Sequence, residues 1–183
     1  IGAFLNSYKY TDESNPSNNK TYNPTGTLGQ NSNITVSGNN STGVLINGSS
    51  NSSATPSKAT LKYGGNVTVS GNGVSGIVVG DNNSGVAEVT AENTGTITVN
   101  NGTGVSAGIY KDIVWANKIK KGSYGIIVGK NSSLVSSATK NVNVNANIKG
   151  AESIGTYAGE NAILEIGNHT VNAYEGAVNY AAA

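Results

Sequence analysis

The chain has 183 residues, a formal net charge of +1 and 11% charged side chains, less than half of the roughly 25% typical of a soluble domain. Half of the chain is Asn, Gly, Ser and Thr (28, 25, 21 and 17 residues), and there is no Cys, Met or Arg. This composition excludes a helical bundle, because these residue types form helices poorly. The missing Cys excludes a disulfide scaffold, no apolar run approaches the ~18 residues of a membrane-spanning helix, and the small net charge gives no indication of a nucleic-acid partner.

Residues 1–33 resemble the middle of a repeat rather than its beginning. Gly2-Ala3-Phe4-Leu5-Asn6 matches Gly43-Val44-Leu45-Ile46-Asn47, so both stretches are predicted to be equivalent strands. The stretch from Thr11 to Thr25 contains Pro and small polar residues and is expected to loop out. We therefore expect residues 1–33 to form a partial coil with an extended polar loop.

From residue 34 onward, short segments alternate β-branched and polar residues, as in Ile34-Thr35-Val36, which is the pattern of a half-buried strand. The pattern recurs at irregular but similar intervals of 33, 30, 22, 23 and 29 residues. The predicted coil starts are near Ile34, Val67, Ile97, Ile119, Val142 and Val171.

A second recurring signature is a Gly followed by apolar residues. It begins at Gly43, Gly76, Gly108, Gly125, Gly155 and Gly176, and three copies continue to a second Gly, a charged residue and Asn: Gly80-Asp81-Asn82, Gly129-Lys130-Asn131 and Gly159-Glu160-Asn161. A third strand is predicted at Ala59–Tyr63, Val86–Ala91 and Ala162–Ile166. Four of the glycines that begin the Gly-apolar segments, Gly43, Gly76, Gly125 and Gly155, are expected to adopt positive φ or to lie close to another backbone.

Three short strands cannot enclose a core, but stacked copies can, because each strand then pairs with its equivalent one copy away. The sequence therefore predicts an all-β fold, a single-stranded right-handed parallel β-helix of about six coils over residues 34–183. Neither end carries the polar cap that solenoids need, so we expect a fragment of a longer array. The outward column is predicted to be Thr35, Thr68, Thr98, Lys120, Asn143 and Asn172. A β-sandwich and a two-layer roll remain competing folds.

Enzymatic chemistry is not expected. The ten acidic residues are dispersed, with Asp12-Glu13 the one adjacent pair, and His169 is the single His. A glycoside hydrolase needs two facing carboxyls, and a metal site needs clustered ligands. We predict no catalytic residue, no metal and no cofactor.

The Gly-[Ile/Val]-x-[Val/Ala]-Gly-x-Asn signature occurs at Gly76–Asn82 and Gly125–Asn131, and at Gly155–Asn161 with Thr156 in the second position. In a chain without Cys, these three stretches resemble the secreted passenger of Gram-negative type V autotransporters. The Asn- and Lys-rich composition is similar to that of the large fusobacterial adhesins. The resemblance implies a passenger on the bacterial surface that binds host or bacterial glycans or proteins, anchored in the outer membrane by a C-terminal barrel. A chain that crosses the oxidising periplasm unfolded also benefits from having no Cys.

A basic stretch is the predicted binding region. Residues 111–149 contain seven Lys and one acid, Asp112, which gives a local charge of +6. Aromatic rings beside ammonium groups suit an anionic glycan. The expected contact residues are Tyr110, Lys111, Trp115, Lys118, Lys120, Lys121 and Tyr124. The alternative is that Trp115 fills the core and the lysines form a solvated face.

Three other functions compete with adhesion: a carbohydrate-active β-helix enzyme, a toxin passenger that oligomerises through its edges, and an ice-binding solenoid. The Thr column at residues 35, 68 and 98 suggests ice binding, but its expected continuation as Lys120, Asn143 and Asn172 breaks the regular array.

Overall fold

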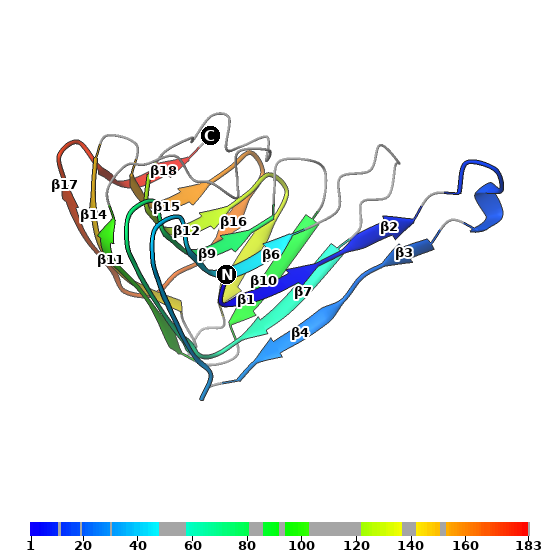
Figure 1. Cartoon of the computed structure of the whole chain (residues 1–183), viewed down its shortest axis with the longest axis horizontal. Coiled ribbons are helices and arrows are strands. Elements are labelled where there is room, and N and C mark those ends of the chain that lie inside the picture. Colours follow the sequence, from blue (N-terminus) through cyan, green and yellow to red (C-terminus); the bar gives the residue numbers. More distant parts are fainter. Residues whose placement is uncertain are drawn as a thin grey trace.

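The computed structural model describes residues 1–10, 12–18, 20–29, 31–47, 58–80, 86–91, 94–102, 122–136, 142–150 and 153–182. Most of the described residues belong to three parallel sheets (Figure 1). Sheet I contains β1 (Ala3–Asn6), β6 (Thr42–Asn47), β9 (Ser75–Val79), β12 (Tyr124–Val128), β15 (Ile154–Ala158) and β18 (Val178–Ala182). Sheet II contains β4 (Thr25–Leu28), β7 (Lys58–Tyr63), β10 (Val86–Ala91), β13 (Ser133–Ser136) and β16 (Ile163–Leu164). Sheet III contains β5 (Asn33–Ser37), β8 (Asn66–Ser70), β11 (Gly95–Gly102), β14 (Val142–Lys149) and β17 (His169–Tyr174).

The chain visits the sheets in a fixed order, III, I, II, and each circuit adds one strand to each sheet. All strand pairs within the three sheets are parallel, and equivalent residues lie side by side; Ile34 pairs with Val67, and Val67 pairs with Ile97. The expected parallel β-helix is therefore confirmed. The expected match between the N-terminal strand and the next coil is also confirmed, since Ala3 of β1 pairs with Val44 of β6 and Asn6 with Asn47.

The core is a stack of β-branched and small side chains inside the three sheets. Alternate residues of sheet III point inward, and Val67, Val69, Ile97, Val99, Val142 and Val144 are buried, while Ile34 and Val36 pack against them near one end. Thr35 is exposed and Thr68, Thr98 and Asn143 are half-buried on the outer face. For these residues, the inward and outward positions expected from the alternation are confirmed.

The glycines that begin the sheet I strands are required by close packing. A Cβ added to Gly43 would overlap with the side chain of Val67, and one added to Gly76 would overlap with Ile97 and lie against the carbonyl oxygen of Gly125. Gly125 and Gly155 are equally crowded. None of these four adopts positive φ, so the expected close approach of backbones is the reason for this column of glycines.

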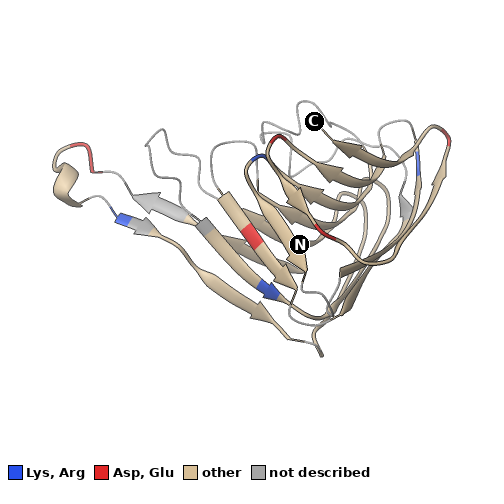
Figure 2. Cartoon of the chain, turned by 180° about the vertical axis from the view of Figure 1, so that it is seen from behind, with Lys and Arg blue, Asp and Glu red and all other residues tan. Residues whose placement is uncertain are grey.

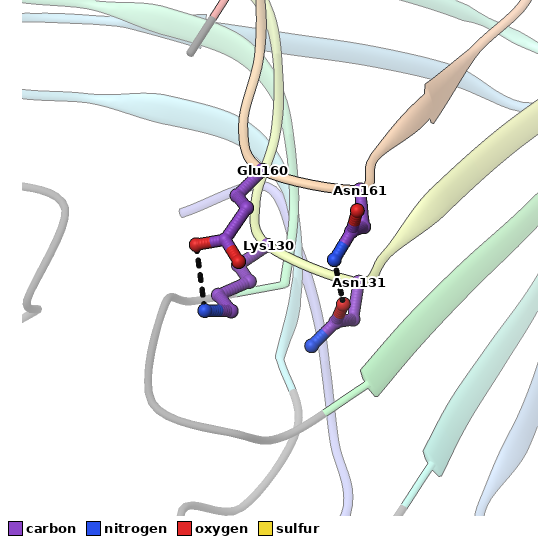
Figure 3. Close-up of polar contacts among 4 residues, drawn as sticks. All are labelled: Lys130, Asn131, Glu160 and Asn161. Carbon is purple, nitrogen blue, oxygen red and sulfur yellow. Dashed lines mark hydrogen bonds and ion pairs between the residues drawn. The ribbon is translucent and has the colours of Figure 1, made fainter.

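The turns after these strands explain the Asn of the signature. Asn131 and Asn161 adopt left-handed backbone conformations, with φ of 55° and 54°, which Asn tolerates better than most residues. Their amide groups stack: Nδ2 of Asn161 donates to Oδ1 of Asn131 at 3.3 Å (Figure 3). Beside them, Nζ of Lys130 lies 2.6 Å from Oε2 of Glu160 in an exposed ion pair.

The predicted alignment of the later coils is wrong. β11 pairs directly with β14, so no strand lies between them in sheet III, and the coil expected to start near residue 119 has no place there. β9 likewise pairs directly with β12, which leaves no strand between them for the copy at Gly108. Ile97 pairs with Val144 rather than Val142, because the spacing of the alternating pattern does not fix the register by itself. Ile119 and Gly108 themselves lie outside the described residues.

The N-terminal third contains an element that the sequence pattern did not predict. β2 (Tyr8–Tyr10) and β3 (Lys20–Tyr22) pair antiparallel, and the 3₁₀ helix η1 (Pro16–Asn18) lies at their tip. This hairpin, residues 8–22, projects away from the stacked sheets (Figure 1), and we call it the arm. The stretch expected to be a polar loop is thus partly a hairpin.

Candidate functional site

The basic stretch predicted as the binding region lies largely outside the described residues. This applies to Tyr110, Lys111, Trp115, Lys118, Lys120 and Lys121, whose role stays a prediction. Tyr124 is described: it begins β12 and is 1% exposed, packed with Leu45, Val78, Ile127 and Tyr157. The ring of Tyr124 therefore contributes to packing and is not at the surface.

The arm contains a surface pocket of about 340 Å³ lined by Asp12, Asn18, Lys20 and Tyr22. Two of these residues belong to the tip and two to β3, so the hairpin pairing brings them to one place. The ring of Tyr22 is half exposed, at 50%. The pocket thus combines an aromatic ring, an ammonium group, an amide and a carboxylate.

Asp12 orders the tip of the arm. Its Oδ1 accepts hydrogen bonds from the backbone N–H of Ser14 (3.0 Å), the hydroxyl of Ser14 (2.7 Å) and the backbone N–H of Asn15 (3.0 Å). Its Oδ2 accepts from Nδ2 of Asn18 at 3.1 Å. These hydrogen bonds, that of the Ser14 hydroxyl above all, lower the pKa of the Asp12 carboxyl from 3.8 to about 2, because they stabilise its charged form.

Hydrogen bonds of Asn15 with the residues that follow it support the same turn. Oδ1 of Asn15 accepts from the hydroxyl of Ser17 at 2.5 Å and from its backbone N–H at 3.3 Å, and the N–H of Asn18 donates to the carbonyl of Asn15 at 2.9 Å. Such side-chain to backbone contacts are the means by which Asp, Asn and Ser fix turns. The Asn18 amide is therefore held beside Asp12 before any partner binds.

The outer face of sheet III is a second candidate surface. It carries three columns of uncharged polar side chains, and each coil contributes one residue to each column. The columns are Asn33, Asn66, Thr96, Asn143 and Asn168; Thr35, Thr68, Thr98, Asn145 and Thr170; and Ser37, Ser70, Asn100, Asn147 and Asn172.

Amide groups bond along two of these columns. Nδ2 of Asn66 donates to Oδ1 of Asn33 at 3.2 Å, and in the third column Asn147 donates to Asn100 at 3.2 Å and Asn172 to Asn147 at 2.7 Å. These ladders link successive coils, so the Asn residues stabilise the stack. The middle column corrects the expected one, because Thr98 is followed by Asn145 and Thr170 and not by Lys120, Asn143 and Asn172.

Charged side chains are sparse over the described part of the rod (Figure 2). No group of three or more His, Asp or Glu residues gathers there as a metal site would require. His169 contacts the hydroxyl of Thr156 through Nε2 at 3.4 Å, and partial burial lowers its pKa. No helix in the described ranges is long and apolar enough to cross a bilayer. The absence of catalytic activity stays a prediction.

Sequence reasoning missed the arm pocket, although a signal was present. Tyr8-Lys9-Tyr10 and Lys20-Thr21-Tyr22 are two alternating segments on either side of a stretch rich in turn residues, which is a hairpin pattern. Comparisons with protein-family models, curated protein sequences and solved structures found no match.

Proposed function

We propose that the chain is part of a bacterial surface adhesin, the passenger of a type V autotransporter, in which the β-helix is the rod and elements on its side bind host or bacterial surface glycans or proteins. The single observation that supports this most is the arm. A hairpin of fifteen residues leaves the stack of sheets between β1 and β4 and carries a polar pocket.

A rod with a side element is suited to contact at a distance. Each coil adds ~4.8 Å to the length of the stack, and every strand inside it is fixed by neighbours on both sides. The rod therefore holds its projections in defined positions away from the surface that carries it. Loops and hairpins on a rigid scaffold are where binding residues concentrate.

The composition supports the same proposal. The chain has no Cys, so it reaches an oxidising compartment without forming disulfides on the way. Its stability comes instead from Asn ladders and β-branched core residues, which form only as the coils stack.

Antibodies raised against the purified chain test the location. They are expected to label intact cells of the producing bacterium, and protease added outside is expected to remove the label. Labelling only after permeabilisation would contradict the proposal.

Beads coated with the chain test adhesion, and they are expected to bind host or bacterial cells. Beads coated with the Val69→Asp variant are the control, since a charge at this fully buried position prevents folding.

A second candidate function is ice binding by the outer face of sheet III. The corrected middle column has Thr at four of five levels, at Thr35, Thr68, Thr98 and Thr170, so the break that argued against this function is reduced to Asn145. Thermal hysteresis of the purified chain tests it. A measurable gap between melting and freezing, lost in the Thr68→Lys/Thr98→Lys variant, would support it, and no gap would exclude it.

A further inference from the structure

We propose that the arm pocket is a binding site for a neutral sugar, with Tyr22 as the stacking surface and Asn18 and Lys20 as hydrogen-bonding groups. This inference rests on the proposed adhesin function and names the ligand class of its binding element. It differs from the anionic glycan expected at the basic stretch, because the pocket has a different charge.

The ring of Tyr22 supplies the apolar contact. It is 50% exposed on β3, whereas Tyr63 and Tyr124 are 1% exposed in the body of the rod. An aromatic ring offers a flat apolar face with a polar hydroxyl at its end. The C–H face of a pyranose ring matches such a surface, and its hydroxyl groups extend beyond the edge of the ring.

Two neighbouring side chains match those hydroxyl groups. The ammonium of Lys20 offers three donors, and the amide of Asn18 offers an acceptor oxygen besides the donor group that already contacts Asp12. Adjacent hydroxyls of a sugar can accept from Lys20 and donate to Asn18 at the same time. A combination of one ring with a few directed polar groups is the usual composition of a small-molecule site.

The carboxylate of Asp12 selects against anionic sugars. With a pKa of about 2, it stays negative throughout the physiological range and cancels the charge of Lys20 in the same pocket. A sialic acid or uronic acid would bring a second negative charge close to Asp12, and like charges at short range repel. A neutral hexose or hexosamine meets no such repulsion.

The pocket is ordered before binding. Four hydrogen bonds to Asp12 and two to Oδ1 of Asn15 fix the tip, so a ligand need not pay for arranging Asn18. This matters for an exposed hairpin, which would otherwise lose much of its binding energy to ordering.

A glycan array probed with the purified chain tests the proposal. We expect binding to glycans that end in neutral hexoses or N-acetylhexosamines and weaker binding to their sialylated forms. Tyr22→Ala is expected to lower the affinity about tenfold or more, while Tyr22→Phe, which keeps the ring, stays within about threefold of the wild type. Tyr174→Ala is the matched control, because Tyr174 is 57% exposed on β17, away from the arm. Equal melting temperatures establish that all variants are folded.

A second variant tests the effect of the negative charge of Asp12. Asp12→Asn removes the negative charge, so binding to sialylated glycans is expected to rise relative to binding to neutral ones. An unchanged preference would show that Asp12 does not set the ligand class and would overturn this part of the proposal.

The outcomes separate this inference from the adhesin function. Glycan binding that Tyr22→Ala leaves intact, a preference for sialylated glycans, or no glycan binding at all overturns the pocket proposal, even if beads coated with the chain still adhere to cells. If antibodies fail to reach the chain on intact bacteria, the adhesin proposal fails, whereas sugar binding by the purified chain is unaffected by that result.

Discussion

Asn161 lies directly above Asn131 in the stack, thirty residues later in the chain, and the two side-chain amides bond at 3.3 Å while both backbones adopt left-handed conformations. The backbone N–H of Asn131 also donates to the carbonyl of Glu160 at 3.0 Å, so the two turns are joined through main chain and side chain. The Asn of the repeated signature therefore has two roles, since it permits the turn and links one coil to the next.

These two roles are separable by substitution. Asn161→Gly keeps access to positive φ and loses only the exposed amide bond, so we expect it to lower the free energy of unfolding by about 0.5 kcal/mol. Asn161→Ala also loses the short polar side chain whose local contacts let Asn adopt the left-handed conformation, and it is expected to cost about 1–2 kcal/mol. Urea unfolding of both variants measures the difference, and an Ala variant as stable as the Gly variant would show that the left-handed turn is not what selects Asn.

The architecture was predictable because several independent signals agreed. Alternation identified Val67 and Val69 as inward residues, and the match of Gly2–Asn6 to Gly43–Asn47 placed the first strand correctly. The register of β14 was not predictable in the same way. Val142-Asn143-Val144-Asn145 alternates over its whole length, so a shift by two residues satisfies the pattern equally well, and only contacts with β11 decide.

The column of glycines in sheet I gives the second prediction. Gly76→Ala places a β-carbon against Ile97 and the carbonyl of Gly125 inside the stack, and overpacking of this kind costs at least about 2 kcal/mol. Gly29→Ala is the matched control, because nothing lies within 4 Å of the added carbon. Thermal or urea unfolding is expected to show a large loss for Gly76→Ala and a change within about 0.5 kcal/mol for Gly29→Ala. Equal effects would contradict the packing of these glycines.

The register of β11 and β14 gives the third prediction. The chain has no Cys, so two introduced Cys residues are the only thiols that a cross-linker can join. Thr98 and Asn145 are register partners on adjacent strands, about 4.8 Å apart, whereas Thr98 and Thr170 are separated by a second strand spacing. A short thiol cross-linker is expected to join Thr98→Cys/Asn145→Cys rapidly and Thr98→Cys/Thr170→Cys slowly. Failure of the first pair to cross-link would show that another strand separates β11 from β14.

The pH dependence of the arm gives the fourth prediction. Because the pKa of Asp12 is lowered in the folded arm, the charged carboxylate favours the ordered tip. Its contribution is complete above the ordinary value of 3.8 and is lost as the pH falls through about 2. The amide resonances of Ser14 and Asn15, which donate to Asp12, are expected to shift with a midpoint near pH 2. A midpoint near 3.8 would mean that these hydrogen bonds do not form in solution.

The candidate site was less predictable than the fold, and the reason is physical. The columns of the stack repeat, so each copy supports the interpretation of the others, but the arm occurs between β1 and β4 and has no second copy among the described elements to align with. Its key contacts are also local to the tip, between Asp12 and Ser14, Asn15 and Asn18, and depend on turn geometry that residue types alone do not specify.

Removal of the arm tests most directly the claim that a stable rod presents a separate binding element. Residues 8–22 are replaced by Asn-Gly, which joins Ser7 to Asn23; the pairing of Tyr8 with Tyr22 brings these two ends of the arm close together. Binding to the glycan array and the melting temperature are then measured on the same preparation. We expect a melting temperature close to that of the wild type and loss of sugar binding, because the three sheets do not depend on the hairpin. Sugar binding that persists in the armless rod would show that the arm is not the binding element.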